Sequence, residues 1–174
     1  AHGAVPLLLH RPLMQVLLPG LGGGSAIDLA KAVAALAPHT EDPFDHLEVV
    51  GKGLPIPGPG LPCAAIPTTA GTGAEATRNA VLAADDVKVS LRGPQLLPKL
   101  AVVDPYLTID LPREQTGYSG LDALTQLVEP FVSRFANPLS DGFCREGIPR
   151  SVRALPDALH DGLDLAARTD LALA

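Results

Sequence analysis

The sequence predicts an α/β domain followed by part of an all-α helical domain. Short apolar segments alternate with a helical pattern and glycine-rich loops through the first part of the chain, as in α/β layer structures. Beyond residues 104–111 the apolar positions recur every three or four residues, and no further strand segment follows. We therefore place the boundary between residues 1–107 and residues 108–174.

The composition allows one well-packed core. With 174 residues, 47% of them hydrophobic, the chain can bury enough apolar surface to remain folded. A net charge of −6 without a basic cluster argues against nucleic acid and anionic membranes as partners, and no apolar run is long enough to span a membrane. Cys63 and Cys144 have no metal-type spacing and are typical of a reducing compartment, so we expect a cytoplasmic location. The chain lacks an initiator Met, and we expect it to be a fragment of a longer protein.

The first glycine-rich stretch, Gly22–Lys31, follows a predicted strand at 14–18 and includes the start of a predicted helix from Ser25 to about Ala37. We interpret Ser25 as the N-cap of this helix and Asp28 as its capping-box partner. The three glycines bring no side chains, so an anion could reach the backbone amides at the positive end of the helix dipole. An ordinary glycine turn without a ligand is the alternative, because such turns are common. The stretch also differs from the dinucleotide fingerprint, since Ser25 stands where the third glycine should be.

The middle of the chain alternates loops with short strands. Residues 40–62 are rich in Pro and Gly and predict a surface loop. We expect a strand at 63–66, a hairpin of 80–84 and 87–91, and a buried strand at 100–103.

The second glycine-rich loop, Thr68–Thr77, follows the strand at 63–66 and contains four threonines and two glycines. Hydroxyls can donate to phosphate or ribose oxygens, and glycines allow a close approach of the ligand. Taken alone, the loop could equally be a threonine-rich turn that caps a helix near Ala74. Two such loops at the carboxyl ends of neighbouring strands favour nucleotide binding, so we interpret residues 1–107 as a partial dinucleotide-binding α/β domain.

Two helices are predicted in the last third of the chain. Apolar residues at helical spacing run from Leu121 to Val132, and Asn137-Pro138 is a good start for the next helix. Gly117 and Gly147 fall within these patterns and are expected to weaken the helices.

Several motifs resemble those of the iron-containing (group III) alcohol dehydrogenase family, in the same order, from about residue 22 to residue 174. They are Gly22-Gly23-Gly24-Ser25-x-x-Asp28-x-Ala30-Lys31, Pro67-Thr68-Thr69-Ala70-Gly71-Thr72-Gly73-x-Glu75-x-Thr77, Asp104-Pro105-x-Leu107-Thr108, Leu111-Pro112, Gly120-x-Asp122-Ala123-Leu124-Thr125 and Ala136-Asn137-Pro138. The resemblance implies an oxidoreductase whose NAD(P) lies between an α/β domain and a helical metal-binding domain. In such enzymes a divalent metal, iron or zinc, assists hydride transfer between the nicotinamide and an alcohol, aldehyde or ketone.

The resemblance also implies where the cofactor is bound. The pyrophosphate is expected at the first glycine-rich stretch, and the adenosine and nicotinamide sides along the threonines of the second loop, with a strand lysine reaching the cofactor. The implied cofactor-binding residues are Gly23, Gly24, Ser25, Asp28, Thr68, Thr69, Thr72, Thr77 and Lys88.

The implied metal ligands depart from the family pattern. The family places Asp and His four residues apart on one helix, where both side chains share a face. Asp122 is present, but Gln126 stands at the histidine position, and two further family histidines would fall beyond Ala174. An amide oxygen is a poor ligand for Zn²⁺ or Fe²⁺, and Pro130 removes the helical hydrogen bond to the Gln126 carbonyl.

Two alternatives remain open at this point. One is a metal-independent reductase of the same superfamily, similar to maleylacetate reductases, although the second loop of those enzymes usually differs. The other is a non-catalytic nucleotide-binding fragment. In the enzyme interpretations the partner is a small-molecule alcohol or aldehyde. The identity of the alcohol, NAD against NADP, and the oligomeric state, for which a homodimer is one expectation, are left open.

Overall fold

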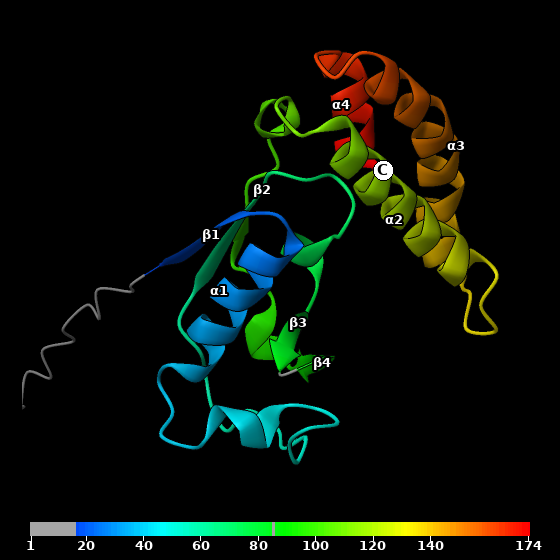
Figure 1. Ribbon diagram of the computed structural model, residues 1–174. Coiled ribbons are helices and arrows are strands. Elements are labelled where there is room, and N and C mark those ends of the chain that lie inside the picture. Colours follow the sequence, from blue (N-terminus) through cyan, green and yellow to red (C-terminus); the bar gives the residue numbers. More distant parts are fainter. Residues whose placement is uncertain (1–16, 85) are drawn as a thin grey trace, which may run out of the picture.

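The computed structural model describes residues 17–84 and 86–174, and the predicted fold class is confirmed: an α/β domain is followed by helices (Figure 1). Three parallel strands lie in the order β1-β2-β5, and β3 and β4 form a separate antiparallel hairpin. The strands are β1 (Leu18–Gly22), β2 (Cys63–Pro67), β3 (Asn79–Ala84), β4 (Val87–Arg92) and β5 (Leu100–Ala101). The predicted strand at 63–66 and the predicted hairpin are therefore confirmed.

Helix α1 (Gly24–Leu36) contacts both the parallel sheet and strand β3 of the hairpin. It matches the predicted helix, with each end one residue earlier. The helix approaches β1 so closely at Gly20 that an added Cβ would lie 2.9 Å from the Ala30 Cβ. A core cluster then joins α1 to the hairpin and to the long loop after α1. Its buried members are Ala32, Ala35, Leu47, Ile56, Ala80, Ala84, Val89, Leu91 and Leu96.

Two strand predictions need correction. The first strand begins at Leu18 instead of ending there, and it continues to Gly22, while residues 14–16 lie outside the described part of the chain. Parallel pairing of Leu18 with Cys63 and onward along β2 uses only backbone groups, so the glycines of β1 are accommodated. The predicted buried strand at 100–103 is the short strand β5, which is exposed because it occupies an edge of the sheet.

The predicted surface loop at 40–62 is mostly irregular, as expected, but it also contributes to the core. His46, Leu47 and Ile56 are buried, and the ring Nδ1 of His46 lies 3.1 Å from the Leu54 carbonyl oxygen. Pro and Gly predict the lack of regular structure correctly, but they do not reveal which apolar side chains fold inward.

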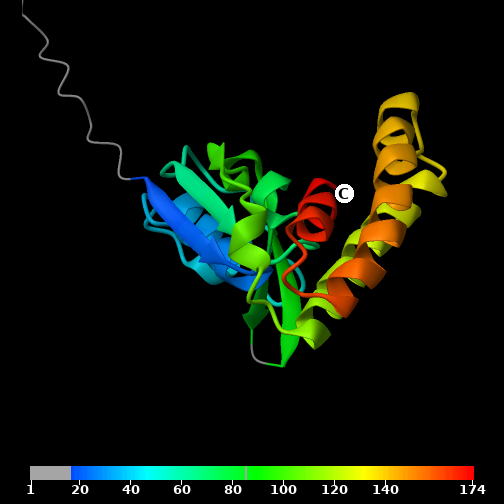
Figure 2. The ribbon, with the colours of Figure 1, turned by 90° about the horizontal axis from the view of Figure 1, so that it is seen from above.

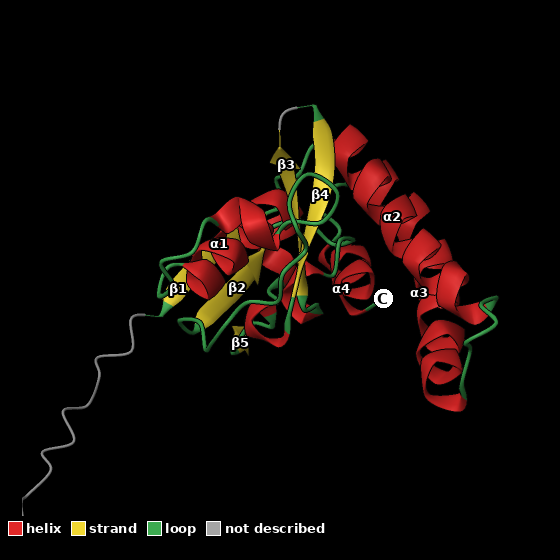
Figure 3. Ribbon diagram, turned by 90° about the horizontal axis from the view of Figure 1, so that it is seen from below, coloured by secondary structure: helices red, strands yellow, loops and turns green. Residues whose placement is uncertain are grey.

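The C-terminal part consists of α2 (Arg113–Phe131), α3 (Pro138–His160) and α4 (Leu165–Leu173). Asn137 caps α3 as predicted, and a full capping box forms with Ser140. Figure 2 shows α2 and α3 side by side as one antiparallel pair, with α4 on the side that faces the α/β domain. The same arrangement is visible from below in Figure 3.

Glycines bring α2 and α3 into close contact. An added Cβ on Gly120 would lie 2.4 Å from Leu155 Cδ1, and one on Gly147 would lie 2.7 Å from Leu127 Cδ2. The expectation that Gly147 only weakens its helix is therefore incomplete, because this glycine also makes room for a packed leucine.

Arg168 connects α4 to the start of α2 through hydrogen bonds. The guanidinium is buried and donates to Thr116 Oγ1 at 2.8 Å, to the Gly162 carbonyl at 3.0 Å and to the Leu111 carbonyl at 3.4 Å. Burial lowers the pKa of Arg168 below its ordinary value.

The domain boundary between residues 107 and 108 stays a prediction. A short 3₁₀ turn, η4 (Pro105–Thr108), occupies that position. None of the helices in the described ranges is both long and apolar enough to cross a membrane.

Candidate functional site

The two glycine-rich loops lie against each other at the carboxyl ends of β1 and β2. The amide of Thr68 donates to the Gly22 carbonyl at 2.9 Å. A Cβ on Gly23 would lie 3.4 Å from Thr69 Cγ2, and one on Gly24 would lie 2.8 Å from Thr72 Cγ2. The structure thus brings together two loops that are far apart in the sequence. The close approach of Thr72 leaves no room for a side chain at residue 24.

The N-terminus of α1 has no side-chain cap. Gly23 is the N-cap residue in place of the predicted Ser25, and no capping-box bond to Asp28 forms. The amides of Ala26 and Ile27 donate back to the Gly23 carbonyl at 3.0 and 3.2 Å. The amides of the two helical positions before them, Gly24 and Ser25, have no acceptor within the helix. Together with the helix dipole, they can bind an anion.

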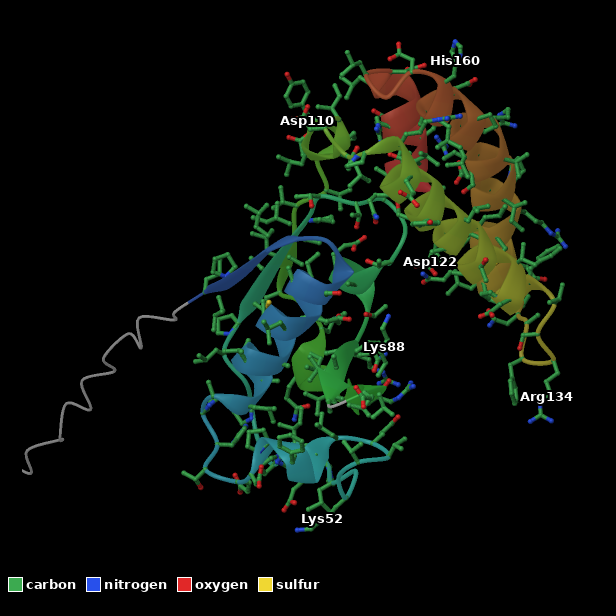
Figure 4. The ribbon with its side chains drawn as sticks, in the orientation of Figure 1. Lys52, Lys88, Asp110, Asp122, Arg134 and His160 are labelled. Atoms are coloured by element: carbon green, nitrogen blue, oxygen red, sulfur yellow. The ribbon has the colours of Figure 1, made fainter. Side chains whose placement is uncertain are left out.

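A cleft of about 810 Å³ opens in front of this helix end, between the α/β domain and α2. We call it the large cleft. Its lining includes apolar side chains such as Leu29, Phe44 and Val81. Figure 4 shows Lys88 on the hairpin side and Asp122 on α2. Eight of the eleven predicted site residues line the large cleft: Gly24, Ser25, Asp28, Thr72, Thr77, Lys88, Asp122 and Gln126.

A second cavity of about 270 Å³, the small cavity, lies on the other side of the threonine loop. Its lining includes Thr69, Asp104 and Thr108 together with residues of α4. Thr69 Oγ1 is shielded from solvent and has no hydrogen-bond partner among the described residues, so it can bind to a ligand in the cavity. Gln126 lines both spaces. Thr68 lines neither of them, and its amide bond to Gly22 joins the two loops.

Asp28 and Thr77 are engaged with Lys31, a residue to which the sequence assigned no role. Lys31 is 0% exposed, and its ammonium group donates to Asp28 Oδ1 and to Thr77 Oγ1, both at 3.0 Å. The sequence did contain a signal, because Lys31 lies four residues after Ile27 on the face of α1 that is otherwise apolar.

The predicted metal ligands do not form a complete site. Asp122 is exposed, while the Gln126 amide Nε2 donates to the Gly71 carbonyl at 3.0 Å. Helix α2 continues through Pro130 to Phe131, so the proline lies in the last turn and the helix persists around Gln126. In residues 17–84 and 86–174, no group of three His, Cys, Asp or Glu side chains is close enough to share an ion. One carboxylate and one amide oxygen are too few and too weak to hold iron or zinc.

Cys63, the first residue of β2, is a buried free thiol, as is Cys144 in α3. Burial raises the pKa of Cys63 above its ordinary value, and the positive charge of Lys31 opposes that rise. A raised pKa disfavours the thiolate, so Cys63 is unsuited to act as a nucleophile or metal ligand.

Comparison with known proteins gives consistent matches over most of the chain. The family model for iron-containing alcohol dehydrogenase matches residues 16–105, and the model for the C-terminal part of the Fe-containing alcohol dehydrogenase family matches residues 116–174. The long-chain-alcohol dehydrogenase 1 of Geobacillus thermodenitrificans is 43% identical over 90% of this chain and 39% of its own length. The 4-hydroxybutyrate dehydrogenase of Cupriavidus necator is 39% identical over 88% of this chain and 41% of its own length.

Among solved structures, the sulfoacetaldehyde reductase from Bifidobacterium kashiwanohense in complex with NAD⁺ superposes with a TM-score of 0.85. It is 32% identical, and the match covers 90% of this chain and 41% of the reductase. The chain therefore spans about two fifths of the length of the relatives it matches.

Proposed function

Because the chain belongs to the iron-containing alcohol dehydrogenase family, we propose that it supplies the NAD(P)-binding part of an oxidoreductase acting on a small alcohol, aldehyde or ketone. One observation carries the proposal: the uncapped N-terminus of α1 and the threonine loop together border a cleft between the two domains. The relatives are oxidoreductases of alcohols and aldehydes, and one of them was solved with NAD⁺.

In this proposal the pyrophosphate binds at Gly23, Gly24 and Ser25. The backbone amides at the start of α1 donate to the phosphate oxygens, and the Ser25 hydroxyl, which is exposed, adds a further donor. No side chain of the helix end competes for these donors, because the N-cap residue is glycine.

The two arms of the dinucleotide then extend to either side of the threonine loop. The nicotinamide arm occupies the large cleft, where Lys88 contributes a positive charge and Thr72 a hydroxyl. The adenosine arm lies at the small cavity, where Thr69 Oγ1 is available as a donor. When bound, the nicotinamide supplies the hydride acceptor or donor, next to the apolar side chains that line the large cleft.

The described residues do not fit a metal ion, and we assign no step to one. The Gln126 amide is bonded to Gly71, which favours a second candidate function, a metal-independent reductase of the same superfamily. Turnover of an unsaturated keto acid in the presence of a chelator would support this candidate. Nucleotide binding without turnover of any tested substrate would support a non-catalytic binding role.

A single substitution with two opposite effects tests the nucleotide site. Ser25→Asp places a carboxylate at the start of α1, where it should stabilise the fold by about 0.3–1 kcal/mol through the helix dipole. The same carboxylate should repel the pyrophosphate and raise the Kd for NADH about tenfold or more. Fluorescence titration with NADH measures the Kd, and Ser25→Ala is the matched control without charge. If Ser25→Asp binds NADH as tightly as the unchanged protein, the pyrophosphate does not lie at this helix end.

A further inference from the structure

We infer that Lys31 is a positioning residue whose buried ammonium group ties α1 to the segment after the threonine loop and so fixes the shape of the large cleft. The inference deepens the proposed function, because the cleft it shapes is the one to which we assign the cofactor. Lys31 does not itself line that cleft, so it acts through the residues it contacts.

The contacts of Lys31 join three separate elements. Within α1 its Nζ donates to Asp28 Oδ1 at 3.0 Å. Across the fold it donates to the Ala74 carbonyl at 2.8 Å, in the short 3₁₀ turn η2 (Ala74–Ala76), and to the Asn79 carbonyl at 2.5 Å, at the start of β3. The fourth acceptor is Thr77 Oγ1 at 3.0 Å, between those two carbonyls in the chain. An ammonium group has only three hydrogens, so two of the four acceptors must share one of them, and the donor capacity of Lys31 is fully used.

The carboxylate of Asp28 extends the same network to the hairpin. Its Oδ2 accepts a hydrogen bond from the Val81 amide at 3.0 Å, while Oδ1 is bound to Lys31. Both carboxylate oxygens are therefore engaged, and Asp28 is 9% exposed. The Thr77 hydroxyl accepts from Lys31 and lies 3.4 Å from the Asn79 carbonyl, to which it donates. These bonds assign Asp28 and Thr77 to holding the cleft wall, in place of the direct cofactor contacts expected from the sequence.

All four partners of Lys31 line the large cleft: Asp28, Ala74, Thr77 and Asn79. The buried ammonium group of Lys31 can therefore hold the segment from Ala74 to Asn79 in place without entering the cleft. This segment is a short 3₁₀ turn and a loop, so it has little regular backbone hydrogen bonding of its own. The position of this wall sets the space between the start of α1, where Gly24 contacts Thr72, and the hairpin that carries Lys88.

A simpler role would be charge neutralisation, in which Lys31 only compensates the buried Asp28. The two roles predict different behaviour once both charges are removed. With Asp28→Asn and Lys31→Met together, no unpaired charge remains, and the new amide can still accept from the Val81 amide. Stability should then recover relative to Lys31→Met alone, whereas the links from α1 to Ala74, Thr77 and Asn79 are still lost.

The test compares the full chain carrying Lys31→Met, Asp28→Asn/Lys31→Met or Thr77→Val with Lys99→Met, an exposed lysine outside the large cleft. Three quantities are measured: the Kd for NADH by fluorescence titration, the thermal midpoint, and hydrogen exchange of the amides of residues 72–79. We expect Lys31→Met and the double variant to raise the Kd about tenfold or more and to speed exchange of these amides about tenfold. The double variant should regain part of the thermal midpoint, and Lys99→Met should match the unchanged protein in all three.

Wild-type affinity and exchange in the double variant would overturn the inference, because Lys31 would then only neutralise Asp28. If Lys31→Met does not fold, Thr77→Val decides: faster exchange of residues 72–79 together with weaker NADH binding at an unchanged thermal midpoint supports the positioning role, and unchanged exchange contradicts it. If the unchanged protein binds no NADH, the proposed function fails by itself. Exchange of residues 72–79 then still decides the positioning role, which is wrong if the Lys31 variants leave that exchange unaltered.

Discussion

Two glycines three residues apart in α2 should respond in opposite directions to substitution by alanine. In Gly117→Ala the new Cβ would lie 3.7 Å from Leu159 Cδ2, an ordinary van der Waals contact. In Gly120→Ala it would lie 2.4 Å from Leu155 Cδ1 and 3.2 Å from Leu155 Cδ2. Both positions are inside the helix, so both substitutions gain the same helix propensity.

The magnitudes follow from these two distances. Replacing glycine by alanine within a helix contributes about 0.8–1 kcal/mol of stability, and nothing opposes this gain at residue 117. At residue 120 the methyl group must displace Leu155, which is buried in the cluster of α3 and α4, and overpacking of this kind costs about 1–3 kcal/mol. We therefore expect Gly117→Ala to stabilise the protein by about 1 kcal/mol and Gly120→Ala to destabilise it by up to about 2 kcal/mol.

Urea denaturation monitored by circular dichroism measures both changes, and Leu155→Ala completes a double-mutant cycle. Leu155→Ala alone should cost about 2–5 kcal/mol, but in combination with Gly120→Ala the clash is gone and the added methyl fills part of the space. The two substitutions should thus be coupled by about 1 kcal/mol or more. Equal stabilities of Gly117→Ala and Gly120→Ala, or strict additivity of Gly120→Ala with Leu155→Ala, would refute the packing argument.

Three further predictions concern the metal position, the buried thiol and the buried arginine. Gln126→His should bind Zn²⁺ about tenfold more tightly than the unchanged chain, because imidazole is the better ligand; titration with a competing zinc indicator measures this, and equal affinity would show that Asp122 is not positioned to share an ion. Since burial raises the pKa of Cys63, the folded state holds the thiol proton more tightly than the unfolded state. The stability that this difference contributes is therefore complete below the ordinary thiol pKa of 9.0 and is lost as the pH rises above that value. Melting curves between neutral and alkaline pH should therefore fall more steeply for the unchanged protein than for Cys63→Ala, and parallel curves would contradict the shift. Arg168→Met should lower the free energy of unfolding by about 3 kcal/mol, because two well-formed bonds from a charged donor are lost, whereas the exposed Arg153→Met should change it by less than about 0.5 kcal/mol.

Local signals in the sequence predicted the elements of the fold well. The capping box at Asn137 depends only on residues within one turn, so the start of α3 could be predicted almost to the residue. Strand β2 and the hairpin were predicted equally well, because short apolar segments bounded by turns are local features too. The burial of β5 could not be predicted, since an edge and a central strand differ only in which strands lie beside them.

The sequence predicts the candidate site in outline. The predictions that are wrong concern residues whose partners are distant in the sequence. The motif spacing brought the two glycine-rich loops to the same end of the sheet, which the structure bears out. The capping-box interpretation of Asp28 was wrong because its partners, Lys31 and the Val81 amide, are available only once α1 is packed on the hairpin. The place of Lys31 on an apolar helix face indicates burial, but its acceptors Ala74, Thr77 and Asn79 lie 43 to 48 positions away and are known only from the fold. Which of the predicted residues touch the cofactor remains a prediction.

The sequence separation of the bonded residues also leads us to expect an order of folding. The hairpin pairs residues that are near neighbours along the chain, so it can form within microseconds. Parallel pairing of β1 with β2, the bonds from Lys31 to residues up to 48 positions away, and the bond from Arg168 to Thr116 across 52 positions each require a large loop to close first. Because these late contacts surround the large cleft and the junction of the two domains, the proposed nucleotide site is expected to be among the last parts of the protein to acquire its native shape.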